Sequence, residues 1–163
     1  MFLVAVVITG EERDELLKAA ERIEEETGKH LGKWRKTSWA RRNAYLTGIF
    51  SSPLFAGKLL FARYSETKGA YLDLMVLAAA RAILSKARGP YKATVMEVAR
   101  FARGLRSLHV AVHKIRGMKD ESNSLIRLAD AMAGYLRDFM EGQDYARVLA
   151  KSFNVEQKIK ELD

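Results

Sequence analysis

The stretch Lys119–Gly134, KDESNSLIRLADAMAG, has a polar start and an amphipathic continuation, and the fold is inferred outward from it. Its first part holds carboxylates and small oxygen-bearing side chains, whose oxygens can accept the free N–H groups at a helix start. These are Asp120, Glu121, Ser122, Asn123 and Ser124. Apolar residues then recur at three- and four-residue spacing, which predicts an amphipathic helix with one buried face. They are Leu125, Leu128, Ala129, Met132, Leu136, Phe139 and Met140.

Asp130 lies at the flank of this apolar face, and Gly134 follows one turn later. A carboxylate at the edge of a buried face can hold a metal ion, because it is neither free in water nor enclosed in the core. The alternative is a surface ion pair with Arg127 or Arg137, which contributes only about 0.3 kcal/mol. At Gly134 the missing side chain lets something approach closely.

Length and composition limit the possible functions. A chain of 163 residues can form one domain with a real core, and we expect a single domain over residues 1–163. The formal net charge of +8 favours polyanionic partners such as nucleic acid. Cysteine is lacking from the sequence, which excludes disulfides, thiolate metal sites and cysteine nucleophiles. With only three histidines, any metal is expected on oxygen ligands, which suit Mg²⁺ or Mn²⁺.

The N-terminal run Phe2–Thr9 is apolar and rich in valine, which is typical of a strand buried on both faces at the centre of a sheet. The run is too short for a membrane span, and it lacks the basic region of a signal peptide. We therefore expect a soluble, cytoplasmic protein without a membrane partner. Thr9 and Glu12 have capping-box spacing and predict a helix that ends near Gly28.

The stretch Lys29–Arg42 is the most basic part of the chain and also contains both tryptophans. Basic residues beside aromatic ones can contact phosphates and stack on bases, so this stretch is the predicted nucleic-acid-binding site. The alternative is that the tryptophans anchor a helix–loop junction while the charges are solvated. The residues concerned are Lys33, Trp34, Arg35, Lys36, Arg41 and Arg42, with Trp39 between them.

The rest of the chain alternates predicted strands with predicted helices. Strands are expected at 58–64, 91–96 and 108–115, and helices at 39–50, 71–86, in the region following 97 and at 144–163. The helix 71–86 is apolar nearly all round, so it should be the central buried helix, with Asp73 complementing its dipole in the first turn. His109 and His113 share one face of a predicted strand and are expected to be core or surface histidines. The order predicts an α/β fold with a mixed sheet flanked by helices.

The run Val112–Gly134, with its Ser-Leu-Ile-Arg-Leu-Ala-Asp-Ala core, resembles the C-terminal signature of the family called domain of unknown function 3800. The resemblance implies a ribonuclease H-like fold and a metal-dependent nuclease-type site, with Asp130 on the final core helix. Family members usually open with another strand that carries an Asp-Glu-Ser motif, whereas this chain begins at what corresponds to the second strand. They also tend to carry an aspartate at the end of the strand predicted here at 91–96, where the nearest acid is Glu97.

Two functions follow from these expectations. One is a Mg²⁺- or Mn²⁺-dependent nuclease acting on nucleic acid phosphodiesters, for which several carboxylates must converge. The catalytic candidates are Asp130, Glu97 and Asp120, and Asp130 and Asp73 are the candidate metal ligands. The alternative is a non-catalytic nucleic-acid-binding or assembly subunit with an eroded site. If the first strand is missing, Phe2–Ile8 has an unpaired neighbour, which predicts a homo-oligomer or edge pairing.

Overall fold

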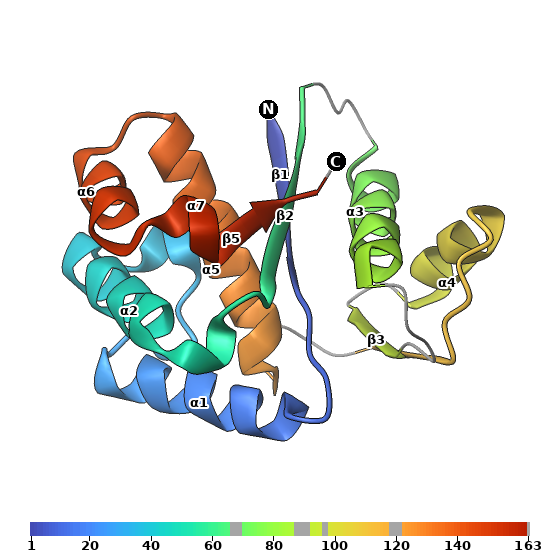
Figure 1. The fold of residues 1–163 in the computed structure, drawn as a ribbon, viewed down its shortest axis with the longest axis horizontal. Helices are drawn as coiled ribbons and strands as arrows, with labels where there is room; N and C mark the ends of the chain where they lie inside the picture. Colours follow the sequence, from blue (N-terminus) through green and yellow to red (C-terminus); the bar gives the residue numbers. More distant parts are fainter. Residues whose placement is uncertain (66–69, 87–91, 96–97, 118–121, 163) are drawn as a thin grey trace.

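The structure is a computed structural model that describes residues 1–65, 70–86, 92–95, 98–117 and 122–162. Within these ranges the predicted α/β fold is confirmed, although the strands form two sheets and not one (Figure 1). The strands are β1 (Phe2–Val7), β2 (Leu59–Tyr64), β3 (Lys92–Val95), β4 (Lys114–Gly117) and β5 (Ile159–Glu161). The helices are α1 (Arg13–Glu26), α2 (Trp39–Ser51), α3 (Tyr71–Lys86), α4 (Val98–Ser107), α5 (Ser124–Met140), α6 (Asp144–Phe153) and α7 (Val155–Lys158), with short 3-10 helices η1 (Trp34–Lys36) and η2 (Pro53–Phe55) on either side of α2.

The larger sheet has the order β1-β2-β5, so β2 is its central strand. β1 runs antiparallel to β2, with Phe2 opposite Tyr64, and β5 runs parallel to β2. The prediction that Phe2–Thr9 lies at the centre of the sheet was wrong, because among the described strands β1 is at the edge, and most of its residues are only half-buried. A continuous apolar run shows that both faces of a strand are covered, but it does not encode how many neighbouring strands it has.

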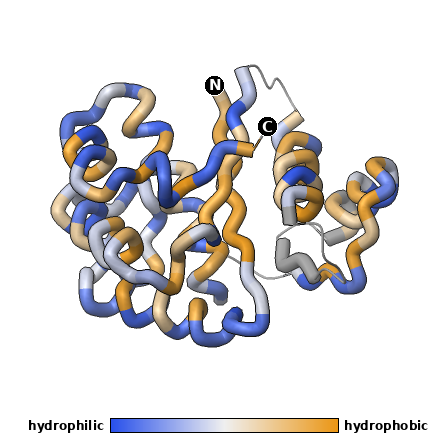
Figure 2. The backbone as a smooth tube through the Cα atoms, in the orientation of Figure 1, coloured by the Kyte–Doolittle hydropathy of each residue, from blue (hydrophilic) through white to orange (hydrophobic). Residues whose placement is uncertain are grey.

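Helices cover both faces of this sheet. Alternate residues of β1 face opposite sides, as the two-residue period of a strand requires. Leu3, Ala5 and Val7 face the main core with α1, α2 and α5, while Val4 and Val6 face α3. In Figure 1 the sheet is therefore sandwiched between α1, α2 and α5 to α7 on one side and α3 on the other. Figure 2 shows hydrophobic residues along most of β1 and β2, although β2 ends in Arg63 and Tyr64.

The second sheet, of parallel strands β3 and β4, lies with α4 beside α3. A separate cluster of buried side chains holds α3 and α4 together, and it includes Val76, Ala80, Phe101 and Leu105. Because α3 packs against β1 and β2 on one side and α4 on another, its apolar residues serve two clusters. This helix was predicted to be the central buried helix. Its middle is buried in both clusters, whereas Tyr71 and Leu84 near its ends are 52% and 65% exposed.

Three local predictions also need correction. Strand β4 begins at Lys114 and not at 108, because the chain turns after α4 with His109 at a positive φ of 56°. The tail ends in α7 and β5, so it is more than the single helix expected. The capping box of Thr9 and Glu12 does not form; α1 begins at Arg13, and Glu12 accepts a hydrogen bond from Lys58. No helix in the described ranges is long and apolar enough to cross a membrane.

Candidate nucleic-acid interface

The basic stretch is fastened to the core by Trp34, whose side chain is buried. Its indole nitrogen donates a hydrogen bond of 3.0 Å to Oδ2 of Asp138 on α5. The indole ring lies directly against Gly134, where an added Cβ would clash with Cδ1 of Trp34. The prediction of a close approach at Gly134 is therefore confirmed, and the approaching group is the tryptophan of the basic stretch.

Arg42 on α2 binds the same carboxylate, that of Asp138. Its Nη1 donates to Oδ2 of Asp138 at 3.0 Å, and its Nε donates to the carbonyl oxygens of Trp34 and Thr37 at 3.1 and 3.0 Å. The guanidinium carbon also lies 5.0 Å from the centre of the Trp34 ring, within cation–π range. The Tyr145 hydroxyl of α6 donates to the same carboxylate oxygen, and burial followed by this hydrogen bond raises the pKa of Tyr145. Asp138 thus ties η1, α2 and α6 to α5.

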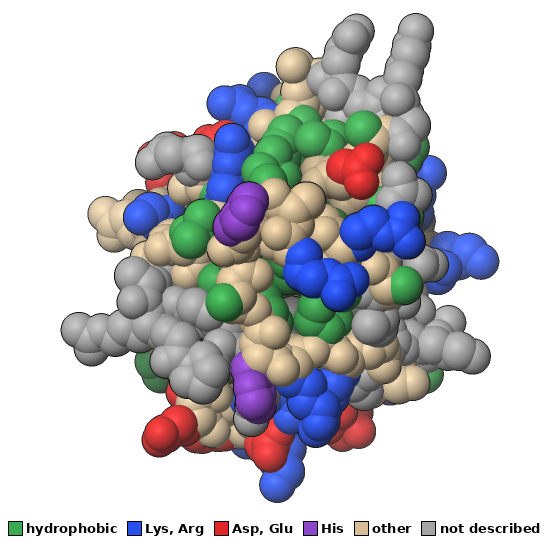
Figure 3. Space-filling view, turned by 90° about the vertical axis from the view of Figure 1, so that its right-hand side faces the viewer, with side chains coloured by type: hydrophobic (Ala, Val, Ile, Leu, Met, Phe, Trp, Pro, Cys, Tyr) green, Lys and Arg blue, Asp and Glu red, His purple; other side chains and the backbone are tan. Residues whose placement is uncertain are grey.

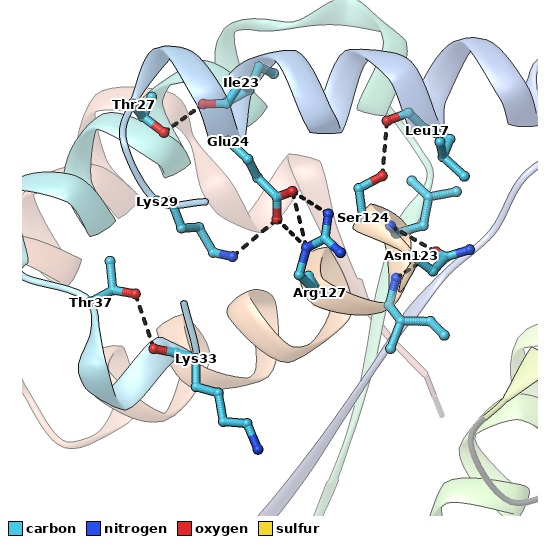
Figure 4. A network of polar contacts seen from close by, with 12 residues as sticks. Leu17, Ile23, Glu24, Thr27, Lys29, Lys33, Thr37, Asn123, Ser124 and Arg127 are labelled. Carbon is cyan, nitrogen blue, oxygen red and sulfur yellow. Dashed lines mark hydrogen bonds and ion pairs between the residues drawn. The ribbon is translucent and has the colours of Figure 1, made fainter. Parts of the chain in front are cut away.

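A second anchor holds the start of the stretch (Figure 4). The buried carboxylate of Glu24 on α1 accepts a hydrogen bond of 3.2 Å from Nζ of Lys29. The same carboxylate also accepts a hydrogen bond of 2.6 Å from Nη2 of Arg127 on α5, and this hydrogen bond raises the pKa of Arg127. Lys29 lies 4.8 Å from the ring centre of Tyr45, a phenol whose pKa burial raises well above its usual value. Two of the stretch's cations, Lys29 and Arg42, are therefore used inside the protein.

The remaining cations of the stretch point into solvent. Lys33, Arg35, Lys36 and Arg41 are all exposed. Trp39 is 57% exposed, and its ring lies 5.4 Å from that of Tyr145, centre to centre. This group of five residues is called the basic-aromatic surface below, and it combines positive charge with an accessible aromatic face. The predicted residues Trp34 and Arg42 differ from it, because their polar groups are occupied by the Asp138 anchor.

The predicted acidic residues do not assemble in the described part of the chain. Asp130 is exposed, and the alternative ion pair with Arg127 or Arg137 does not form among the described residues: Arg127 binds Glu24, and Nη2 of Arg137 lies 3.9 Å from Oδ1 of Asp138. Asp73 lies on α3, which covers the opposite face of the sheet from α5. Glu97 and Asp120 fall outside the described residues. Within the described ranges, no three aspartate, glutamate or histidine residues are grouped so as to hold a metal ion.

Sequence reasoning missed a second basic group, on α4 and β4. Its members Arg103, Arg106, Lys114 and Arg116 are exposed, and so are His109 and His113. Figure 3 shows this side of the molecule, where basic side chains are scattered among hydrophobic ones. The three-residue spacing of Arg103 and Arg106 could have revealed a shared helix face. Nothing in the sequence marks Asp138 as an anchor, because its three partners are distant from it or lie on another helix.

No family model matches the sequence, and no curated protein or solved structure shows significant similarity to it.

Proposed function

We propose that this protein binds nucleic acid through its basic-aromatic surface. Lys33, Arg35, Lys36 and Arg41 contact backbone phosphates, and the exposed ring of Trp39 stacks on a base. The observation that carries the proposal is that the residues of the basic stretch fall into two groups. Its buried residues hold the backbone in place, while four cations and the indole of Trp39 remain exposed. The net charge of +8 adds long-range attraction to a polyanion.

Anchoring matters for affinity, because ordering a flexible segment on binding costs free energy. Here η1 and the start of α2 are held by Asp138 before any ligand arrives. Four phosphate contacts release the counterions of the phosphates that they neutralise. The logarithm of affinity should then fall against the logarithm of salt concentration with a slope of about −3 for single strands.

We further propose that the chain is a ribonuclease H-like domain, as the local resemblance of Val112–Gly134 implies. Supporting features are a mixed sheet covered by helices on both faces and a C-terminal core helix, α5, that packs on β1 and carries Asp130. The separation of the strands into two sheets departs from the single mixed sheet that was expected.

The test compares two variants of equal charge. In one, the four cations of the basic-aromatic surface are replaced by Ala; in the other, Arg103, Arg106, Lys114 and Arg116 of the α4–β4 group are replaced by Ala. Affinity for a fluorescein-labelled single-stranded oligonucleotide and for its duplex is measured by anisotropy at several salt concentrations. The first variant should lose at least about tenfold in affinity, and its salt slope should flatten by about 3. The second should lose much less.

The outcomes are distinguishable. If only the α4–β4 variant loses binding, nucleic acid uses the other face and the proposal fails. If both variants lose affinity equally, attraction is diffuse and there is no localised site. A further change, Trp39→Ala, should weaken binding to single strands more than to the duplex, because only unpaired bases are free to stack.

A divalent-metal-dependent nuclease is the second candidate, and the exposure of Asp130 without an ion pair in the described ranges favours it. The described residues alone do not fit a two-metal site, which requires several converging carboxylates, so no catalytic step is derived. Calorimetric titration of Mn²⁺ into the protein and into Asp130→Asn tests this candidate. Heat that disappears in the variant would place a metal at Asp130; equal traces for both proteins would exclude Asp130 as a ligand.

A further inference from the structure

We propose that the open edge of β1 pairs antiparallel with β1 of a second copy of this chain. In the described residues β1 has β2 as its only strand partner, and its other edge has none. A free edge carries unpaired N–H and C=O groups that can template pairing with another chain.

The register identifies the groups that face outward. Ile8 donates its N–H to the carbonyl of Lys58 at 2.9 Å, in line with the β1–β2 pairing. In an antiparallel ladder, hydrogen-bonded pairs alternate along the strand, so Phe2, Val4 and Val6 also direct their backbone groups toward β2. The N–H and C=O groups of Leu3, Ala5 and Val7 consequently point away from β2, toward the open edge.

These three residues form a self-complementary set. When two copies pair about Ala5, Ala5 lies opposite its own symmetry mate and Leu3 lies opposite Val7 of the other copy. All of these are hydrogen-bonded pairs, so the two strands can exchange six backbone hydrogen bonds. A surface that matches itself in this way suits the two-fold symmetry that most homodimers adopt.

The strand also lacks the features that usually block edge pairing. Natural edge strands are commonly protected by charged side chains, by proline or by a bulge. The segment Phe2–Ile8 contains neither charge nor proline, and all six residues of β1 pair with β2 in unbroken register. No like charges would therefore oppose each other across the new strand pair. Helices pack on both faces of the sheet, so the proposed pairing uses the edge of β1 and not a face.

Salt separates this interaction from nucleic-acid binding. Each chain carries a formal charge of +8, so two copies repel each other at long range, and salt screens that repulsion. Self-association should strengthen as salt increases, whereas affinity for nucleic acid should fall. The strand-pairing proposal does not depend on the proposed function, and either can fail alone.

The experiment combines sedimentation velocity with residue-resolved amide hydrogen exchange on the full chain. The sedimenting mass should rise from one chain to two with concentration. Over the same range, the amides of Leu3, Ala5 and Val7 should become protected, while those of Val4 and Val6 should be protected throughout. A monomer at every concentration, with fast exchange at the three outward amides, would overturn the proposal. Protection of those amides in a species that sediments as one chain would mean that another segment covers the edge, and would overturn it too.

Ala5→Pro sharpens the test, because proline removes an outward N–H without removing a hydrogen bond to β2. Ala5→Gly is the matched control, since it also changes the side chain but keeps the N–H. The proline variant should lose dimerisation at least tenfold, and the glycine variant should retain it. Circular dichroism checks that both variants fold. If Ala5→Pro does not fold, the amide-exchange result on the unaltered protein decides the question.

Discussion

Arg41 and Arg42 are neighbours in the sequence but have different roles in the structure. Arg41 is exposed, whereas the Arg42 side chain is only 12% exposed and binds Asp138 and two backbone carbonyls. The same division runs through the whole basic stretch, where Lys29 is buried against Glu24 and Lys33, Arg35 and Lys36 are in solvent. A basic run therefore cannot be treated as one binding surface, because some of its charges hold the surface in place.

What separates the two groups is the presence of a buried carboxylate. Asp138 on α5 is distant in the sequence from Arg42 on α2. Glu24 is only five residues from Lys29, but it also binds Arg127 on the distant helix α5. A cation that meets such a partner with hydrogen bonds can be buried, while one that does not must stay in water. The following predictions test this division, from the largest expected effect to the smallest.

Replacing Glu24 by Gln should destabilise the protein most. The change leaves Lys29 and Arg127 buried without their shared anion, which should cost about 3 to 5 kcal/mol in free energy of unfolding. The measurement is equilibrium unfolding in denaturant, followed by tryptophan fluorescence. Glu26→Gln on the same helix is the control, because Glu26 is exposed and its ion pair with Arg22 is long, at 3.9 Å; it should change stability by less than about 0.5 kcal/mol. Equal effects for both would refute the distinction between buried and exposed charges.

The adjacent arginines should give opposite phenotypes. Arg42→Ala removes hydrogen bonds to Asp138 and to two carbonyls, and should cost about 2 to 3 kcal/mol. Arg41→Ala should leave stability within about 0.5 kcal/mol but lower affinity for the oligonucleotide. Unfolding and anisotropy measurements on both variants check the pair. A loss of stability in Arg41→Ala as large as in Arg42→Ala would break the comparison.

Gly134→Ala tests whether helix propensity or packing against Trp34 has the larger effect on stability at this position. Propensity alone would stabilise α5 by about 1 kcal/mol, whereas the clash with Trp34 should cost about 1 to 3 kcal/mol. We expect a net loss of stability and a shifted tryptophan emission, because the Trp34 ring must move from Asp138. Ala133→Gly, one residue earlier and half-buried, calibrates the propensity effect. A net gain in stability in Gly134→Ala would show that the Trp34 ring can move away from position 134 at little cost in free energy.

The smallest effect concerns Glu12 and Lys58 at the surface. The hydrogen bond from Lys58 lowers the pKa of Glu12 below its ordinary value of 4.5. A lowered folded-state pKa contributes stability above the unfolded value, and that contribution is lost as the pH falls through the folded pKa. Glu12→Gln should therefore be slightly less stable than the unaltered chain at neutral pH, and the difference should vanish in acid. Unfolding curves measured across the acid range would detect a difference that persists and so contradicts this origin.

Local structure was largely predictable. The helices Tyr71–Lys86 and Trp39–Ser51 agree with expectation, the second to within one residue, because apolar spacing is a local signal. The capping of α5 also agrees in kind: Oδ1 of Asn123 accepts the N–H groups of Leu125 and Ile126. Predictions failed where pairing decides the outcome, as for β5, a three-residue strand that exists because it lies beside β2.

The candidate site was predictable only in its composition. Its positive charge, its tryptophans and the need for a close approach at Gly134 were all inferred from the sequence. Which tryptophan is buried was not, since both lie in the same basic stretch: Lys33 and Arg35 flank Trp34, and Arg41 lies two residues after Trp39. The partner that separates them, Asp138, is 104 residues from Trp34 in the chain.

The sequence by itself therefore determined the α/β class, the basic character of the protein and most of its helices, because these follow from composition and from periodicities within one segment. Only the tertiary structure decided that β1 is an edge strand, that Lys29 and Arg42 are structural cations, and that Asp130 and Asp73 lie on helices covering opposite faces of a sheet. The physical reason is that burial and pairing are properties of contacts between distant segments, and these contacts select among side chains that the local sequence leaves equivalent.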